Sequence, residues 1–250
     1  MSQSKSKIGA HKIRLSTVDS TNNFAAKLIN EGLCDHGSVI LAENQTNGRG
    51  QRGSEWQSLE KQNILTSFIF EFKSLDPHDL FRVNAYVSIA ILDFLNNLNI
   101  DASIKWPNDI LVNGKKICGI LIENKLTGTT LTHSVAGFGL NVNQVEFVDL
   151  NAATSLRLEN QKEYNIEFLW LDLISSFRKW EDFLISDNKK ENLQEMYKNN
   201  LFGLNELRRF KIGSKIIQGK IKGIDVQGHL LLQIGEAVHS FQNKEIVYLS

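Results

Sequence analysis

The chain has 250 residues, of which 42% are hydrophobic and 22% are charged, and 28 Lys and Arg residues balance 28 Asp and Glu residues. This length fits one sizeable domain, or one domain with a small addition, at ~100–200 residues per domain, and the composition argues against disorder. A protein that holds nucleic acid through its phosphates normally has a basic surplus, so the formal net charge of zero argues against that class.

Cysteine usage and the first residues indicate the compartment. Cys34 and Cys118 lie far apart and neither belongs to a Cys-x-x-Cys pair, so we expect neither a disulfide framework nor a zinc site. The opening Met-Ser-Gln-Ser-Lys-Ser-Lys is polar and lacks the apolar region of a secretory signal. No apolar run approaches the ~20 residues that a membrane helix needs. We therefore expect a soluble, cytoplasmic protein without membrane contact.

Apolar periodicity and turn residues predict the first elements. A short strand is expected over 12–18, followed by a helix with Ser20 or Thr21 as its N-cap and Gly32 at its end. Two more strands are expected at 38–42 and 63–72. The clearest helix spans 77–99, with Pro77 in its first turn and one apolar stripe facing the core.

The second half of the chain predicts strands, then helices, then strands again. Strands are expected at 103–106, 109–112, 117–125 and 131–141, with hairpin turns at Asn113-Gly114 and Thr127-Gly128. Helical periods follow at 165–184 and 191–201. After Gly203, short alternating strands punctuated by glycine are typical of a small β-barrel. We therefore place a domain boundary near Leu204, between residues 1–203 and 204–250.

The segment 47–56, Asn-Gly-Arg-Gly-Gln-Arg-Gly-Ser-Glu-Trp, is the most informative stretch. Glycine permits close backbone approach, arginine offers a rigid fork of donors for phosphate, and tryptophan supplies a flat apolar wall. This segment, here called the glycine loop, therefore predicts a binding site for a molecule that has both a phosphate and an apolar part. The alternative is a tight surface turn with incidental charges, which would have a similar sequence. It is not a Walker A loop, and its G-x-G-x-x-G spacing alone is weak support for a dinucleotide site.

Three further clusters carry polar chemistry. Asp19-Ser20-Thr21-Asn22 is either an ordinary N-cap or a helix start that faces a polar ligand. Gly137-Phe138-Gly139-Leu140-Asn141 is either a glycine-weakened strand with a turn or a backbone surface with an asparagine amide beside a ligand. The six histidines show no metal-ligand spacing, and no Gly-x-Ser-x-Gly elbow of a hydrolase is present.

The third cluster is Lys105-Trp106-Pro107-Asn108-Asp109, in which Pro107 ends a strand. Asn108 and Asp109 could hold a metal-bound phosphate, and Lys105 could balance its charge. The alternative is a hairpin with solvated charges, which fits Lys115 better than Lys116. Lys116 lies inside an apolar strand and therefore needs an anionic partner or a ligand.

In this order, the motifs Asp-Ser-Thr-Asn, Gly-Arg-Gly-x-x-Gly with a nearby Trp, Lys-Trp-Pro-Asn-Asp, Lys-x-x-Gly-Ile-Leu-x-Glu and Gly-x-Gly-Leu-Asn resemble those of the biotin protein ligases. The resemblance runs from about Ile13 to the end and is to a short form without the N-terminal DNA-binding domain. It implies an α+β fold: a mixed or antiparallel, class II synthetase-like sheet flanked by helices, with a small C-terminal SH3-like β-barrel.

The resemblance also implies a two-step reaction. The biotin carboxylate attacks the α-phosphate of ATP, which gives biotinyl-5′-AMP and pyrophosphate. A lysine of a biotin carboxyl carrier protein, from acetyl-CoA carboxylase or a related carboxylase, then attacks this anhydride and releases AMP. Cationic groups must offset the repulsion between the two anions, and a closing loop must exclude water.

By motif match, the resemblance implies site residues. Lys116 and Arg49 would be the catalytic cations. The implied biotin contacts are Ser20, Thr21, Asn22, Gln45, Gly48, Arg49, Lys116 and Gly119. The implied ATP contacts are Arg49, Gln51, Arg52, Trp56, Lys105, Asn108, Asp109 and Asn141, with Mg²⁺ at Asp109.

Two departures from the family pattern lead to further expectations. Many relatives have arginine at the positions of Gln51 and Ser54, so we expect looser retention of the adenylate, because a neutral amide lacks a charge-assisted bond. Too few residues precede the first strand for a winged helix-turn-helix, so we expect no sequence-specific DNA binding. A lipoate or octanoate ligase of the same architecture, a non-catalytic biotin-sensing protein, and a homodimer remain open.

Overall fold

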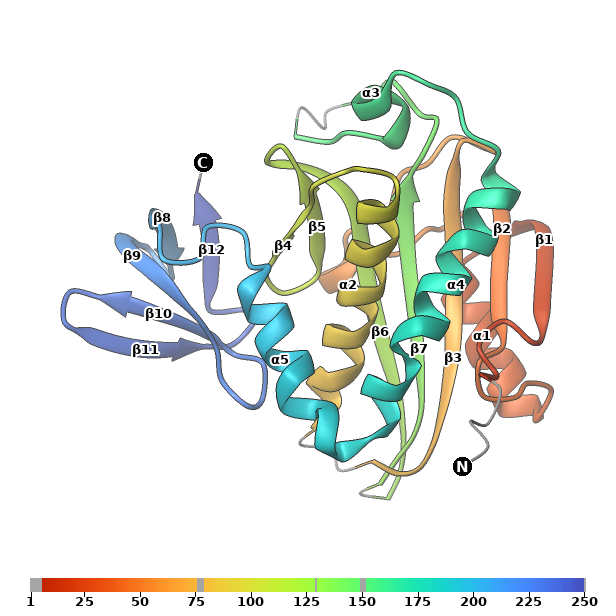
Figure 1. Ribbon diagram of the computed structural model, residues 1–250, viewed down its shortest axis with the longest axis horizontal. Helices are drawn as coiled ribbons and strands as arrows, with labels where there is room; N and C mark the ends of the chain where they lie inside the picture. Colours follow the sequence, from red (N-terminus) through yellow and green to blue (C-terminus); the bar gives the residue numbers. More distant parts are fainter. Residues whose placement is uncertain (1–5, 76–78, 129, 149–151, 250) are drawn as a thin grey trace.

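The computed structural model describes residues 6–75, 79–128, 130–148 and 152–249, and it contains two sheets (Figure 1). The first sheet has seven strands in the order β1-β2-β3-β7-β6-β5-β4. Its strands are β1 (Lys12–Val18), β2 (Val39–Gln45), β3 (Asn63–Leu75), β4 (Ser103–Lys105), β5 (Asp109–Val112), β6 (Lys115–Thr127) and β7 (Thr130–Asn141).

This sheet is mixed, which is one of the two arrangements that the family resemblance implied. Strands β1 and β2 are parallel, and α1 (Thr21–Glu31) connects them, because parallel neighbours need a crossover. The other pairs are antiparallel. Asn113 and Gly114, with φ of 51° and 76°, form the predicted tight turn between β5 and β6, since both central residues of a type I′ turn need positive φ.

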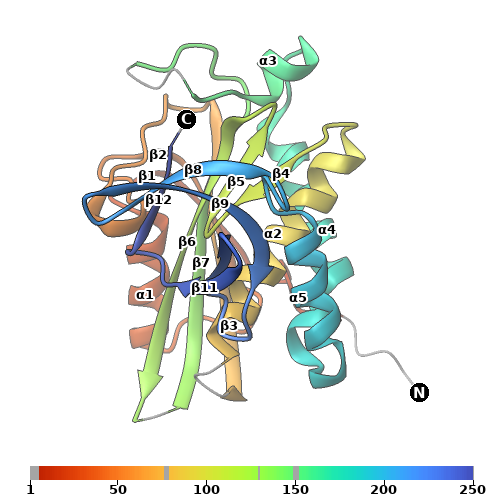
Figure 2. The same cartoon turned by 90° about the vertical axis from the view of Figure 1, so that its left-hand side faces the viewer.

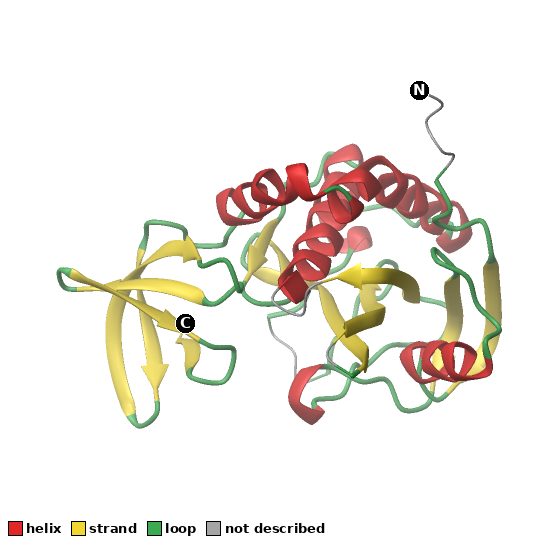
Figure 3. Cartoon of the chain, turned by 90° about the horizontal axis from the view of Figure 1, so that it is seen from below, coloured by secondary structure: helices red, strands yellow, loops and turns green. Residues whose placement is uncertain are grey.

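Helices cover both faces of the sheet. Figure 3 shows α2 (Leu80–Asn97), α4 (Ile166–Ile185) and α5 (Lys190–Asn199) together on one side and α1 on the other. On the first side, Phe177 of α4 stacks on Phe68 and Phe138, with ring centroids 4.2 Å and 5.6 Å apart. On the second side, a smaller cluster joins α1 to Ile40 and Val135. The larger cluster of buried apolar side chains therefore lies between the sheet and α2, α4 and α5, and the smaller one lies under α1.

The second sheet lies at the C-terminus. Its five antiparallel strands follow the order β11-β10-β9-β8-β12 and form the expected small SH3-like unit. Figure 2 shows these strands in front of β4 and β5. The strands are β8 (Leu207–Ile212), β9 (Lys215–Ile224), β10 (Leu230–Ile234), β11 (Ala237–Phe241) and β12 (Ile246–Leu249). The exact boundary near Leu204 stays a prediction.

The element boundaries differ from the predictions in a few places. Helix α2 begins at Leu80, and Pro77 lies outside the described residues. Strand β6 begins at Lys115 rather than at 117, so Lys116 is a strand residue. The short helix α3 (Leu156–Asn160) was missed, although Ser155 caps it by accepting a hydrogen bond from the Leu158 amide. No helix in the described ranges is long and apolar enough to cross a membrane.

Candidate functional site

A cavity of about 280 Å³, here called the first cavity, opens where the two sheets meet. The start of α1, the glycine loop, the β4–β5 turn, the middle of β6 and β7, and the start of β12 all contribute to its lining. The structure thus brings together the four clusters that the sequence indicated. The predicted site residues that line it are Ser20, Thr21, Asn22, Gln45, Arg49, Gln51, Trp56, Lys105, Asn108, Asp109, Lys116 and Gly119.

A β-bulge directs Lys116 into this cavity. Leu111 pairs with Lys116 and Ile110 pairs with Cys118, so Ile117 is an extra residue in the ladder. Because of this extra residue, Ile117 and Cys118 are both buried on the core side, and burial, the largest cause, raises the pKa of the Cys118 thiol. Lys116 and Gly119 then share the face toward the cavity.

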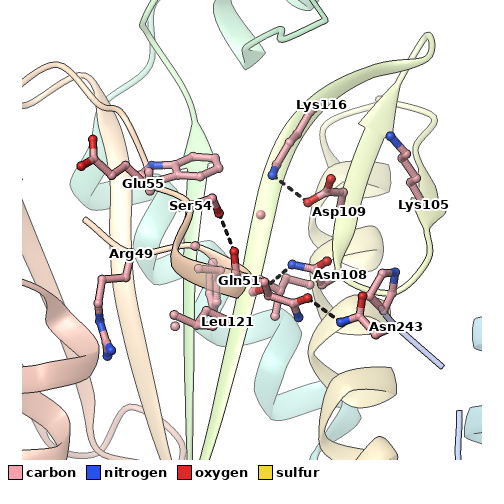
Figure 4. Close-up of a pocket in the computed structure, with 18 of the residues that line it drawn as sticks. Arg49, Gln51, Ser54, Glu55, Lys105, Asn108, Asp109, Lys116, Leu121 and Asn243 are labelled. Carbon is pink, nitrogen blue, oxygen red and sulfur yellow. Dashed lines mark hydrogen bonds and ion pairs between the residues drawn. The ribbon is translucent and has the colours of Figure 1, made fainter. Parts of the chain in front are cut away.

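Lys116 has the anionic partner that its place in an apolar strand required. Its Nζ lies 2.7 Å from Asp109 Oδ1, and its side chain is 37% exposed (Figure 4). The Lys116 backbone is fixed as well, since its amide donates to Ala152 O at 2.7 Å and its carbonyl accepts from Thr154 N at 2.9 Å. The ammonium group is therefore held at a defined point on the cavity wall.

Two glycines on neighbouring strands make a flat floor for Trp56. Gly119 and Gly139 are register partners of β6 and β7. A Cβ added at Gly139 would lie 2.1 Å from Trp56 Cε2, and one at Gly119 would lie 2.8 Å from Cζ3. The indole therefore lies directly on the strands, with Lys116 Nζ 5.4 Å from its ring centroid.

The start of α1 forms a polar network at the other end of the cavity. Ser20 occupies the N-cap position, but its side chain makes no capping hydrogen bond, which favours a ligand-facing role over the N-cap alternative. Gln45 Oε1 accepts from the Thr21 amide at 2.8 Å. Ser67 Oγ bonds to Thr21 Oγ1 and to Asn22 Oδ1, each at 2.7 Å. This network fixes several amide and hydroxyl groups around one pocket end.

Arg49 lies on the opposite wall from Lys116. Its Nη2 is 2.6 Å from Glu123 Oε2, which also accepts from Asn22 Nδ2 at 2.8 Å. Figure 4 shows the Arg49 side chain pointing away from Lys116. The family resemblance implied that both cations meet at the reacting phosphate, and that role stays a prediction. In the structure each cation is paired with its own carboxylate on its own wall.

The β4–β5 turn is held from several sides. Asn108 Nδ2 donates to Ile120 O at 2.7 Å, and Pro107 O accepts from Asn84 Nδ2 at 2.8 Å and from Tyr197 Oη at 2.9 Å. Lys105 Nζ lies 5.5 Å from the ring centroid of Tyr248. This turn therefore presents Lys105, Asn108 and Asp109 to the cavity as a rigid group.

The C-terminal sheet supplies part of the lining, which the sequence analysis did not foresee. Asn243, Ile246, Val247 and Tyr248 all line the first cavity. Burial, the largest cause, raises the pKa of the Tyr248 hydroxyl, so Tyr248 is a neutral wall residue. Nothing in the spacing of residues 204–250 signals this contact, because it depends on how the two sheets dock.

A second cavity of about 430 Å³ adjoins the first cavity, and Lys116 lines both. It shares Trp56, Lys105, Asp109 and Lys116 with the first cavity and adds Asn141. Asn141 Nδ2 donates to Thr154 O at 3.0 Å, while its Oδ1 is buried with no hydrogen-bond partner among the described residues. A buried amide oxygen without a partner is costly, so it is a candidate acceptor for a ligand donor.

Two predicted site residues, Gly48 and Arg52, are not among the residues that line the first cavity. Gly48 lies behind the wall: a Cβ there would be 2.6 Å from Trp56 O, and Gly48 O accepts from Trp56 N at 3.0 Å. Gly48 therefore shapes the loop without lining the first cavity. The side chain of Arg52 lies outside the described residues.

Comparison with known proteins gives consistent matches. The model of the biotin/lipoate A/B protein ligase family matches residues 15–141. The bifunctional ligase/repressor BirA of Escherichia coli strain K12 is 30% identical over 237 residues, which are 93% of this chain and 72% of that protein. The biotin–[acetyl-CoA-carboxylase] ligase of Mycobacterium tuberculosis is 27% identical over 222 residues, 85% of this chain and 79% of that protein.

Solved structures agree with these sequence matches. The biotin protein ligase from Aquifex aeolicus in complex with biotin and ATP has a TM-score of 0.75 and 26% identity, covering 95% of this chain and 97% of that one. A likeness over nearly both full lengths includes the C-terminal sheet as well as the larger one.

Proposed function

We propose, from the premise that this chain belongs to the biotin/lipoate A/B protein ligase family, that it is a biotin protein ligase. It would activate biotin with ATP and transfer the biotinyl group to a lysine of a biotin carboxyl carrier protein. The observation that carries this proposal is Lys116, which a bulge places beside Asp109, Trp56 and the glycine floor, between two cavities. Relatives named biotin–[acetyl-CoA-carboxylase] ligase support the choice of substrate.

The polar end of the first cavity suits biotin. A ureido ring carries both donors and acceptors, and Ser20, Thr21, Asn22 and Gln45 offer both around one point. The biotin carboxylate would then extend toward Lys116. Asn141 and the indole of Trp56 in the second cavity would face the nucleoside.

In the first step, a carboxylate oxygen of biotin attacks the α-phosphorus of ATP and pyrophosphate leaves. Lys116 would offset the repulsion between the two anions and the charge that grows on the phosphoryl oxygens, because its position is fixed before the reaction. To do so, its ammonium must exchange Asp109 for the substrates. In the second step, the amine of the acceptor lysine attacks the acyl carbon, and AMP leaves.

Mg²⁺ is expected to accompany the triphosphate. No cluster of three or more His, Cys, Asp or Glu side chains in the described segments could hold a metal alone. Mg²⁺ commonly binds through one or two carboxylates plus substrate phosphates, so Asp109 beside Lys105 fits that mode. The ion would neutralise phosphate charge, and the chain would contribute Asp109.

Partners and compartment follow from the same proposal. The free Cys34 and Cys118 support a reducing compartment such as the cytoplasm. The balanced charge supports the absence of sequence-specific DNA binding, and a salt-sensitive, site-specific gel shift would contradict it. A homodimer stays a prediction that sedimentation would check.

The decisive experiment is intact mass spectrometry of a carrier domain incubated with this protein, Mg-ATP and biotin. We expect one biotinyl addition, absent without ATP and absent when the acceptor lysine is replaced by arginine. Addition of lipoate or octanoate but not biotin would assign the alternative ligase activity. Binding of biotin without pyrophosphate release would indicate a sensing protein.

A further inference from the structure

The glycine loop is joined to the C-terminal sheet by a direct side-chain contact. Gln51 Oε1 accepts a hydrogen bond from Asn243 Nδ2 at 2.7 Å, across 192 positions of sequence (Figure 4). Both side chains line the first cavity. The contact therefore lies at the site, on the side where the loop meets the second sheet.

The Asn243 end of this contact is anchored. Asn243 lies in the turn between β11 and β12, where the Gln242 amide donates to Glu245 Oε2 at 2.8 Å and the Glu245 amide donates to Gln242 O at 3.0 Å. Strand β12 is paired with β8. The sheet itself is docked on the larger one, because Trp106 Nε1 donates to Gly228 O at 2.8 Å in a buried position.

The Gln51 end belongs to a small unit that is held together by its own hydrogen bonds. Gln51 begins a single 3-10 turn, in which Gly50 N donates to Ser54 O at 2.7 Å and Ser54 Oγ donates to Gln51 O at 2.7 Å. Arg49 and Trp56 flank this turn. A contact that fixes Gln51 therefore also restrains Arg49 and Trp56, which line the first cavity.

We propose that the Gln51–Asn243 hydrogen bond is a latch that holds the glycine loop closed, and that Asn243 is a positioning residue for retention of the activated intermediate. This inference rests on the proposed function. A mixed anhydride must stay shielded from water until the acceptor lysine arrives. Gln51 stands where many relatives have arginine, so this chain secures the loop through a neutral bond between the two sheets.

The first test measures the release of biotinyl-5′-AMP after a single turnover without acceptor. Asn243→Ala should speed release ~2- to 10-fold, the effect of one net hydrogen bond, with little change in the rate of adenylate formation. Gln51→Ala should also speed adenylate release, whatever its effect on adenylate formation, and the double variant should release no faster than the faster single variant. Gln242→Ala, at an exposed position of the same turn, should release at the wild-type rate.

The second test needs no activity. Hydrogen exchange of the amides of residues 48–56, without ligands, should be faster in Asn243→Ala, while the thermal midpoint of the whole chain changes little. Faster exchange in a chain that forms no adenylate would support the latch and refute the proposed function. Adenylate formation with unchanged exchange and release would refute the latch alone, as would an equal effect of Gln242→Ala.

Discussion

Lys116 shows how one side chain is fixed by contacts of three kinds. The Lys116 ammonium group forms an ion pair with Asp109 and lies near the Trp56 ring. Backbone hydrogen bonds to residues 152 and 154 hold the Lys116 main chain. Asp109 is only partly buried, so the ion pair itself adds little stability. The arrangement serves placement of charge rather than stability.

Replacement of this lysine tests its assigned role. Lys116→Ala should lower the rate of adenylate formation by about 10²- to 10³-fold, because a fixed group that stabilises transition-state charge is lost. Pyrophosphate release with biotin and ATP measures this rate. The neighbouring Lys115 is exposed and directed to solvent, so Lys115→Ala is the matched control and should keep its activity. Full activity of Lys116→Ala would mean that the site is misplaced.

Gln51 tests how strongly the loop holds the adenylate. Gln51→Arg loses the hydrogen bond that Gln51 accepts from Asn243 but can donate charge-assisted hydrogen bonds to the adenylate phosphate. Because a charge-assisted bond is roughly twice as strong as a neutral one, adenylate release should still slow ~3-fold relative to wild type. Gln51→Ala is the comparison that removes the hydrogen bond without adding charge. Equal release rates in wild type and Gln51→Arg would dispose of the idea that the neutral amide loosens retention.

The sequence located some of these residues and could not locate others. Lys116 was identifiable because a lysine within an apolar strand needs a partner, and Asp109 was identifiable from its place after Pro107. Ser67 and Asn243 carry no local signal, because their roles arise from contacts with segments 45 and 192 positions away. Glu123 stood within a recognised motif, but its pairing with Arg49 depends on sheet order.

At the scale of elements, the paired glycines of β6 and β7 are the feature that admits an aromatic ring. Gly139→Ala should displace the Trp56 indole, because its Cβ would lie 2.1 Å from Cε2. We expect ATP affinity to fall ~10-fold, measured by equilibrium binding. In a Trp56→Ala background, the same substitution should add little further loss, since the ring that it displaces is gone. Full additivity of the two changes would contradict this account.

The positions of strands and helices were predictable from the sequence, whereas the pairing of the strands with one another was not. The apolar stripes predicted α2 and α4, and the Asn113-Gly114 turn predicted the β5–β6 hairpin. Alternation within β6 alone does not reveal the bulge, because a bulge is defined against the neighbouring strand. The pairing of β3 with β7, which sets the sheet order, likewise depends on non-local contacts.

At the scale of the whole molecule, docking of the two sheets includes one buried hydrogen bond. Trp106→Phe removes the donor to Gly228 O and leaves that carbonyl without this partner, so the free energy of unfolding should fall by ~1–3 kcal/mol. Chemical denaturation measures the change. Trp180→Phe is the matched control, because Trp180 Nε1 has no partner among the described residues. If the free energy of unfolding fell equally in the two variants, the smaller ring of phenylalanine, and not the lost hydrogen bond, would explain the change.

Ligand-linked stability distinguishes the two ligase activities without a carrier protein. A ligand that binds only the native chain stabilises it by ~2.7 kcal/mol at a hundredfold excess over its Kd. Biotin should therefore raise the thermal midpoint of this protein, and lipoate at the same concentration should not. A shift with lipoate alone would reverse the assignment.

The extra residue Ile117 makes the β5–β6 hairpin more sensitive to insertions and deletions than to substitutions. The extra residue in the β5–β6 ladder puts Lys116 on the cavity face of β6, where Asp109 and Trp56 then hold its ammonium group. A substitution in that hairpin leaves the register unchanged, so Lys116 would stay on the cavity face. Insertion or deletion of a single residue in that hairpin would shift the register and turn Lys116 toward the hydrophobic core.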